Sequence, residues 1–195
     1  KIHLTYQKKP CCPKMINNIC NFKPRNELII NYIIECYKED RNILLLSDRR
    51  NHLIELHKLL NDKCIDSGFY VGGMKSTDLK ISESKKIILG TFSMASEGMD
   101  IPKLNTIILG SPKSDIVQSI GRILREKKEN RTKIPLIIDI NDEFSLFMNQ
   151  SSKRLKYYNK NNYDIYIINM KGNVKKYEKQ KKINNDIFLL LIIKH

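Results

Sequence analysis

Short apolar runs alternate along this chain with stretches in which apolar residues recur every three or four positions. The runs are dense in Ile and Leu, which is typical of strands buried on both faces and therefore of central, parallel strands. They lie at Ile43 to Leu46, Lys86 to Gly90, Thr106 to Leu109 and Pro135 to Ile140. Because strands and helices alternate at these spacings, the pattern predicts an α/β fold, a doubly wound, mostly parallel sheet with helices on both faces.

The stretches between the runs carry apolar residues at helical spacing. We expect Asn26 to cap one helix, and a second helix to cover Asn51 to Leu60, with His57 at the edge of the core and His52 in solvent. The remaining expected elements are strands at Phe69 to Val71 and Asp164 to Met170, and helices at Asp78 to Ser84 and Asp142 to Tyr158.

The two ends of the chain differ from its middle. Residues 1–25 hold three prolines without clean periodicity and predict a connecting segment with one strand from Ile2 to Tyr6. Residues 26–172 form the expected domain, and residues 173–195 a basic tail, either a solvated helix or a loose segment. The tail's apolar run, Ile187 to Ile193, predicts a short strand or a docking helix. It is far shorter than the roughly 20 residues of a bilayer helix, so no membrane contact is expected. The chain lacks an initiator Met, and we expect it to be a piece of a longer protein.

The segment from Gly90 to Arg125 holds the most informative polar residues. Gln118, Arg122 and Arg125 fall at i, i+4 and i+7 of a predicted helix and share one face. The opposite face holds Ile116, Ile120, Ile123 and Leu124. A strand and a loop containing Gly98 and Asp100 precede this helix. Such a layout would aim planar, bidentate donors at a phosphate near the carboxyl edge of the sheet.

Four motifs in this region carry a family resemblance. Gly90 and Thr91, with the segment ASEGMDIP ending at Pro102, resemble motif V of superfamily 2 helicases, and QSIGRILR ending at Arg125 resembles motif VI. Upstream, NILLLSDR ending at Arg49 resembles motif IV, and YVGGM ending at Met74 resembles the glycine loop that follows it. The set is similar to that of helicases of large cytoplasmic DNA viruses, including the poxvirus transcript-release type, and of phage recombination helicases.

Two patterns that would bind nucleotide directly are incomplete. Gly68-x4-Gly73-Met74-Lys75 fails as a phosphate loop, because Met74 stands where the loop needs its Lys. Leu136-Ile-Ile-Asp139 is similar to a Walker B strand. Without a phosphate loop, however, Asp139 is better explained as a strand-terminal residue that hydrogen-bonds a loop. The chain therefore resembles the second of the two RecA-like halves of such a motor, and the fragment alone is expected to be inactive.

The resemblance implies roles for particular residues. ATP and Mg²⁺ would be bound mainly by an N-terminal RecA-like half of the same protein, and Arg122 and Arg125 would reach the γ-phosphate, with Arg125 as the arginine finger. Gln118 would hydrogen-bond across the cleft between the halves. Asp100 would lie near the ribose hydroxyls, and Gly98 would allow close backbone approach.

The resemblance also implies contacts to a nucleic-acid backbone, DNA or RNA, with little sequence preference. Thr91 is the best candidate for a phosphate contact, joined by Arg49 and by the amides of Gly72 and Gly73. Two alternatives stay open, that Arg49 is a solvated loop charge and that Gly72 and Gly73 only form a turn. Likeness to viral helicases further implies the host cytoplasm and a role that includes transcription.

Composition excludes only some classes of protein function. The formal net charge of +14 favours a polyanionic partner, although a lysine-rich surface from biased composition would give the same charge. Five cysteines without a secretory signal argue against a disulfide framework, and no C-x-x-C pair or clustered His completes a metal site. Cys36 and Cys64 are expected to be buried. The competing function is a RecA-like module that binds nucleic acid or protein without using ATP.

Overall fold

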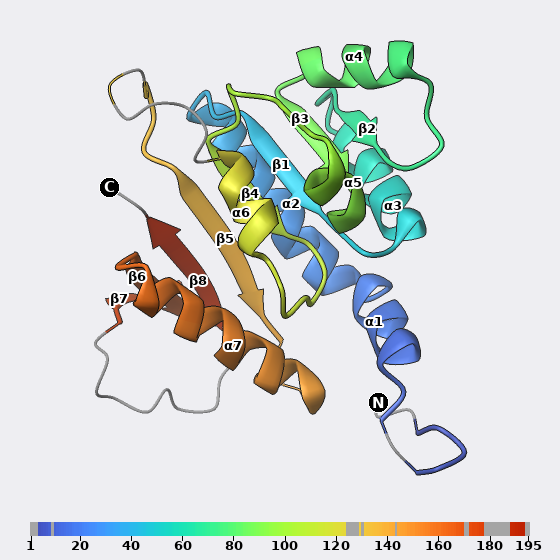
Figure 1. Cartoon of the computed structure of the whole chain (residues 1–195), viewed down its shortest axis with the longest axis vertical. Helices are drawn as coiled ribbons and strands as arrows, with labels where there is room; N and C mark the ends of the chain where they lie inside the picture. The colour runs from blue at the N-terminus through green and yellow to red at the C-terminus, as the bar shows by residue number, and fades with distance from the viewer. Residues whose placement is uncertain are drawn as a thin grey trace.

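The computed structural model describes residues 4–8, 10–123, 129, 131–142, 144–169, 172–177 and 188–193 of the 195-residue chain. In this part, an eight-stranded sheet forms the centre, in the order β2-β3-β1-β4-β5-β8-β6-β7 (Figure 1). The first five strands in that order are parallel: β2 (Gly68–Tyr70), β3 (Ile87–Gly90), β1 (Ile43–Leu46), β4 (Thr106–Leu109) and β5 (Leu136–Asn141). The predicted doubly wound, mostly parallel sheet is confirmed.

The parallel strands are apolar on both faces because helices cover both. Along β1, Ile43 and Leu45 pack into one layer and Leu44 and Leu46 into the other. The first layer contains α2 (Lys23–Lys38) and α3 (Arg50–Asn61), and the second contains α5 (Phe92–Glu97), α6 (Val117–Ile123) and α7 (Leu146–Lys160). Figure 1 shows α2 behind the sheet and α5, α6 and α7 in front of it. Every residue of β1, β3 and β4 is buried, as the apolar runs predicted.

Helix α4 (Ser76–Ser84) lies close to the edge strand β2, and a glycine allows that approach. A Cβ atom on Gly68 would lie 2.7 Å from the Cα atom of Ser82, closer than real Cβ contacts. The first glycine of the incomplete phosphate-loop pattern therefore serves helix packing in this fold.

Part of the N-terminal segment forms a helix that the sequence did not predict. This helix is α1 (Cys12–Cys20), whose apolar face packs against Phe147 at the start of α7. Ile2 and His3 of the predicted first strand lie outside the described residues, and Leu4 forms an isolated bridge with Pro10. Segments far apart in sequence thus meet at this end of the molecule.

The prediction that Asn26 caps a helix is wrong. Helix α2 begins three residues earlier, at Lys23, with Phe22 as its N-cap residue and a proline in its first turn. Proline is favoured at that position because the first helical amides lack an intrahelical acceptor. Asn26 is instead buried inside the first turns of the helix.

Residues 173–195 were expected to form a separate basic tail, but the two strands that the structure describes there belong to the sheet. Strand β8 (Phe188–Ile193) is antiparallel to both β5 and β6 (Asp164–Asn169), and β7 (Val174–Lys176) is antiparallel to β6. Met170, the last residue of one predicted strand, and Ile187, the first of another, lie outside the described residues. No helix in the described ranges is both long and apolar enough to span a bilayer.

Two local predictions fail, one at a turn and one at a short helix that the pattern did not reveal. Cys36 is buried as expected, but Cys64 is exposed, because the chain turns there with a positive φ of 58°. The loop predicted after β3 begins with a short helix, α5, before Gly98 ends it.

His52 is buried, contrary to the prediction that it faces solvent. Its Nε2 lies 3.0 Å from Asn26 Oδ1 and its Nδ1 lies 3.0 Å from Ser47 Oγ, so a neutral ring that donates to Asn26 and accepts from Ser47 satisfies both. Asn26 in turn donates to the Cys20 carbonyl oxygen, and Ser47 Oγ accepts from the Arg49 amide. Burial, with the nearby Arg25 charge, lowers the pKa of His52 to about 3.

This buried histidine predicts a pH dependence of stability. The pKa of His52 is about 3 in the folded chain and 6.5 when unperturbed, so its contribution is present above pH 6.5 and is lost as the pH falls toward 3. The loss should reach about 2 kcal/mol at pH 5. Urea unfolding of the chain between pH 7.5 and 4.5 measures it. His52→Gln should flatten the profile, and the control His57→Gln should not. Equal profiles for His52→Gln and the parent would contradict the assignment.

Candidate functional site

The five parallel strands end at one edge of the sheet, and the loops that follow them form the candidate site. Leu46 at the end of β1 is in register with Gly90 of β3 and Leu109 of β4, and Tyr70 of β2 is in register with Gly90. Parallel strands place their carboxyl ends together, which is where open α/β sheets bind ligands. The loops that carry the predicted residues after β1, β2, β3 and β4 therefore share this edge.

The loop between β4 and α6 is bonded to the loop after β1. The Asp48 amide donates to Ser111 Oγ at 2.9 Å, and the Lys113 ammonium lies 3.2 Å from the Asp48 carboxylate. The same ammonium lies 5.4 Å from the ring centroid of Phe92, the first residue of α5. The loops after β1, β3 and β4 are thus joined directly.

Two buried arginines from other helices donate hydrogen bonds to the same β4–α6 loop. Arg25 of α2 forms a bidentate pair with Asp142 and donates through Nη1 to the Gly110 carbonyl oxygen at 2.6 Å. Arg154 of α7 forms a bidentate pair with Asp139 and donates through Nη1 to the Lys113 carbonyl oxygen, also at 2.6 Å.

The Asp139 pair is deeply buried, with side-chain exposures of 1% for Arg154 and 0% for Asp139. Tyr158 also donates to Asp139. Burial acts to lower the pKa of Arg154, but the Asp139 carboxylate offsets it, so the pKa lies above the usual value. Burial and the Asp139 charge raise the pKa of Tyr158. The expectation that Asp139 hydrogen-bonds a loop is not met among the described residues, where Arg154 and Tyr158 of α7 bond its carboxylate.

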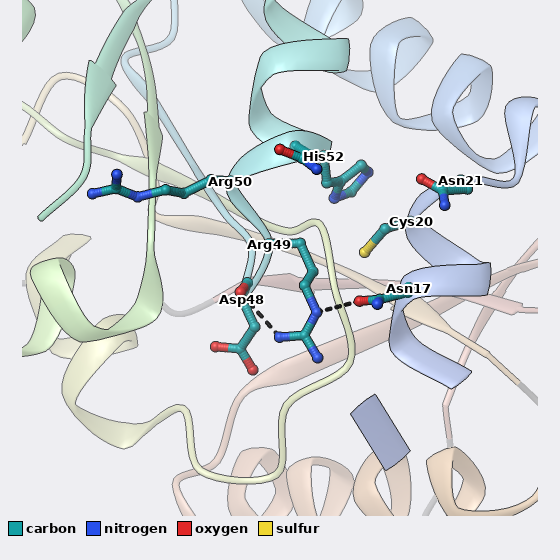
Figure 2. Close-up of a pocket in the computed structure, with 8 residues that line it drawn as sticks. Asn17, Cys20, Asn21, Asp48, Arg49, Arg50 and His52 are labelled. Atoms are coloured by element: carbon teal, nitrogen blue, oxygen red, sulfur yellow. Dashed lines mark hydrogen bonds between the residues drawn. The ribbon is translucent and has the colours of Figure 1, made fainter. Parts of the chain in front are cut away.

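Arg49 lies half-buried between its strand and α1. Its Nε donates to Asn17 Oδ1 at 2.5 Å, and its Nη atoms donate to the carbonyl oxygens of Asp48 and Pro13. Figure 2 shows Arg49 directed toward α1, in a cavity of about 300 Å³ that Cys20 and the first turn of α3 also line. It is thus not a freely solvated loop charge.

Arg50 points the other way and connects two loops. Figure 2 shows it directed away from α1, and its Nη2 donates to the Gly72 carbonyl oxygen. Gly73 has a φ of +82°, so the glycine pair does form a tight turn that favours glycine. The arginine's role in holding this turn was not predicted.

Thr91 begins α5 at the same edge. Its amide donates to the Tyr70 carbonyl oxygen at 3.2 Å, and its hydroxyl oxygen accepts a long 3.5 Å bond from the Met94 amide as the helix cap. A capping hydroxyl keeps its own proton for another acceptor, either Ser93 Oγ at 3.3 Å or a ligand.

One more predicted residue, Gln118, lines a second cavity, and two others lie in the exposed loop after α5. Gln118 and Lys113 line a cavity of about 190 Å³ together with Asp48 and Phe92. Gly98 and Asp100 are exposed after α5, and a Cβ atom added at Gly98 would meet nothing within 4 Å. The structure leaves room there for an approaching group.

The predicted arginine face of α6 is only partly described. Ile116 and Ile120 are buried, as the apolar face required. The backbone of Arg122 belongs to α6, but its side chain and the whole of Arg125 lie outside the described residues. In the described ranges, no group of three or more His, Cys, Asp or Glu is placed to hold a metal ion.

A family model described as "Helicase conserved C-terminal domain" matches residues 25–127, more than half of the chain. The chain belongs to this family. The match begins at Arg25 and includes the loops after β1, β2, β3 and β4. Every residue of the candidate site predicted from sequence falls within this helicase domain.

Two viral relatives are similar over most of the chain. The "Putative ATP-dependent RNA helicase" of Acanthamoeba polyphaga mimivirus is 45% identical over 161 residues, which cover 80% of this chain and 31% of that protein. The "Transcript termination protein" of fowlpox virus is 31% identical over 147 residues, which cover 68% of this chain and 29% of that protein. The helicase domain thus spans less than a third of the length of these relatives.

Solved structures agree on the fold. The structure of T4 UvsW matches with a TM-score of 0.58 and 22% identity, covering 80% of this chain and 35% of that one. The C-terminal domain of the DEAD-box protein Dbp5 matches with a TM-score of 0.56 and 16% identity, covering 72% of this chain and 81% of that one. The chain therefore has the RecA-like fold of helicase C-terminal domains.

Proposed function

We propose that this chain is the second motor domain of an ATP-dependent nucleic-acid helicase or translocase. The observation that supports it most is the junction of the loops after β1, β3 and β4 through Asp48, Lys113 and Phe92, beside the start of α6. This junction gives the helicase family's polar motifs one shared edge of the sheet. The name of the mimivirus relative, an ATP-dependent RNA helicase, supports the same function.

In this proposal the chain completes an ATP site that a first RecA-like half provides. That half would hold ATP and Mg²⁺, and Arg125, with Arg122, would contact the γ-phosphate. A guanidinium placed there stabilises charge on the transferring phosphoryl group, an effect of roughly 10³ to 10⁵ in rate in related enzymes. Gln118 would hydrogen-bond across the cleft between the two halves.

The loop after α5 would contact the nucleotide's sugar. Asp100 would accept hydrogen bonds from the ribose hydroxyls. The open space beside Gly98 supports close approach of a ligand to the backbone, because no side chain among the described residues occupies it.

The nucleic-acid backbone would lie against the loops after β1, β2 and β3. The Thr91 hydroxyl can cap α5 and donate its proton to a phosphate at the same time. The amides of Gly72 and Gly73 would add further donors, in a turn that Arg50 holds. Arg49 would bind phosphate only by exchanging some of its contacts to α1.

The viral relatives also suggest where in the cell, and in which process, the protein acts. Since they come from mimivirus and fowlpox virus, we propose action in the cytoplasm of an infected cell, on RNA or on a transcribed DNA template. Transcript termination, the role in the fowlpox protein's name, is a candidate process.

The competing function is a RecA-like module that grips nucleic acid or protein without coupling to ATP. The basic net charge of +14 fits both functions. A pure binder, however, has no need for Arg122 and Arg125 on one face of the helix that the sequence predicts. The predictions below separate the two functions.

The first prediction concerns the isolated chain. Purified residues 1–195 should hydrolyse ATP no faster than a buffer blank, with or without nucleic acid, because the chain carries neither a complete phosphate loop nor a Mg²⁺-binding motif. A phosphate-release assay measures this, with the full-length protein as the active control. Turnover by the isolated chain that rises with added RNA or DNA would rule out the half-motor proposal.

The second prediction concerns binding. The chain should bind single-stranded RNA and DNA of different sequences with similar, weak affinity, and the affinity should fall steeply between about 50 and 200 mM salt. Fluorescence anisotropy with labelled oligonucleotides measures both properties. Thr91→Ala should weaken binding, and the control Ser84→Ala, at the far end of α4, should not. A salt-independent or strongly sequence-specific interaction would argue against phosphate contacts.

The third prediction separates ATP chemistry from nucleic-acid binding. In the full-length protein, Arg125→Ala should lower the ATPase rate by at least about 10³-fold and change the affinity for nucleic acid only a few-fold. Arg122→Lys should also fail, because an ammonium cannot reproduce the planar fork. Thermal melts of the same variants provide the control. If Arg125→Ala unfolds the domain, the arginine is a structural residue and the motor proposal loses its chemical basis.

A further inference from the structure

The β4–α6 loop runs from Gly110 to Ile116 and leads directly into α6, whose described residues are Val117–Ile123. Any residue that fixes the loop therefore also fixes the direction in which α6 presents its polar face.

Arg25 precedes this loop in the sequence and Arg154 follows it, and both side chains contact the loop in the same way. Each uses Nε and Nη2 for the two oxygens of one aspartate, at 2.8 to 2.9 Å, and each keeps Nη1 for one loop carbonyl at 2.6 Å. Asp139 lies in β5 and Asp142 directly follows that strand. Both arginines are therefore anchored on β5, the strand next to β4 in the sheet.

We propose that Arg25 and Arg154 are positioning residues that fix the Gly110–Ile116 loop and thereby orient α6 for the proposed ATPase reaction, an inference that rests on the proposed function. The aspartates alone would satisfy a structural ion pair. The third nitrogen of each fork instead holds the main chain at the two ends of the Gly110–Lys113 turn. Ser111 and Lys113 hold the turn from the β1 side through Asp48, so the loop is bonded to both neighbouring strands.

Through these bonds, helices near both ends of the domain contact the one loop that leads into α6. Arg25 comes from the first helix of the matched domain, and Arg154 from a helix beyond the matched region. A small misplacement of catalytic groups, of about 1 Å, can lower a rate by about 10²-fold. Loosening either end of the turn should therefore reduce ATP turnover before it unfolds the sheet.

Arg25→Lys and Arg154→Lys in the full-length protein test the proposal. Lysine keeps the charge beside the aspartate but lacks the planar fork that bonds carboxylate and carbonyl together. Arg41→Lys is a matched control. Arg41 also donates to a carboxylate and to a carbonyl oxygen, through Nε to Glu39 and through Nη1 to Ile134, but at the opposite, amino edge of the sheet.

Amide hydrogen exchange with mass spectrometry supplies a readout that a purely structural role would not give. In Arg25→Lys and Arg154→Lys, peptides covering residues 110–123 should exchange at least about tenfold faster, while peptides of β1 and β3 keep the parent rate. The kcat of ATP hydrolysis should fall about 10- to 100-fold, with the KM for nucleic acid within about twofold. Arg41→Lys should change neither quantity.

The positioning role would be overturned if exchange in residues 110–123 stayed at the parent rate. It would also be overturned if faster exchange spread equally over the whole sheet. If the buried Arg154→Lys variant does not fold, Arg25→Lys decides alone, since its partner Asp142 is 12% exposed and the pair is more tolerant. Arg125→Ala separates the two proposals. Parent-like turnover in that variant would overturn the motor function, and the exchange pattern would still decide whether the arginines hold the loop.

Discussion

The candidate site depends on two arginine–aspartate pairs at the carboxyl end of β5. Arg154 with Asp139, and Arg25 with Asp142, each fix a helix to the sheet and a carbonyl of the β4–α6 loop to that helix. Removing one partner of such a buried pair costs about 3–5 kcal/mol, because the other charge is left uncompensated. The energy that holds α2 and α7 in place therefore also holds the loop that leads into α6.

Further hydrogen bonds connect this loop to the other loops at the carboxyl edge of the sheet. Asp48 connects the β4–α6 loop to the end of β1, and the Asn26–His52–Ser47 chain of hydrogen bonds fixes that end of β1 to α2 and α3. Arg50 then joins the first turn of α3 to the glycine turn after β2. A rigid edge of this kind suits a helicase domain that must meet a second domain in a defined geometry.

The sequence predicted what periodicity and local motifs encode. The parallel strands were found to within one or two residues, since buried strands read as unbroken apolar runs. Partners distant in sequence were not predictable, because nothing in the pattern pairs Arg25 with Asp142 across 117 residues. The same limit explains why His52 was expected in solvent, and why residues 173–195 were expected to leave the domain although β7 and β8 belong to its sheet. The candidate residues were located by motif order, and their chemical roles are proposals.

The central claim is that Arg122 and Arg125 contact ATP held by another domain. A structure of the full-length protein trapped with ADP, Mg²⁺, aluminium fluoride and a nucleic-acid strand tests it most directly. The account predicts that Arg125 and Arg122 contact the aluminium fluoride, with the bonds from Arg25 to Gly110 and from Arg154 to Lys113 retained. Arginines turned away from a fully bound nucleotide would contradict it.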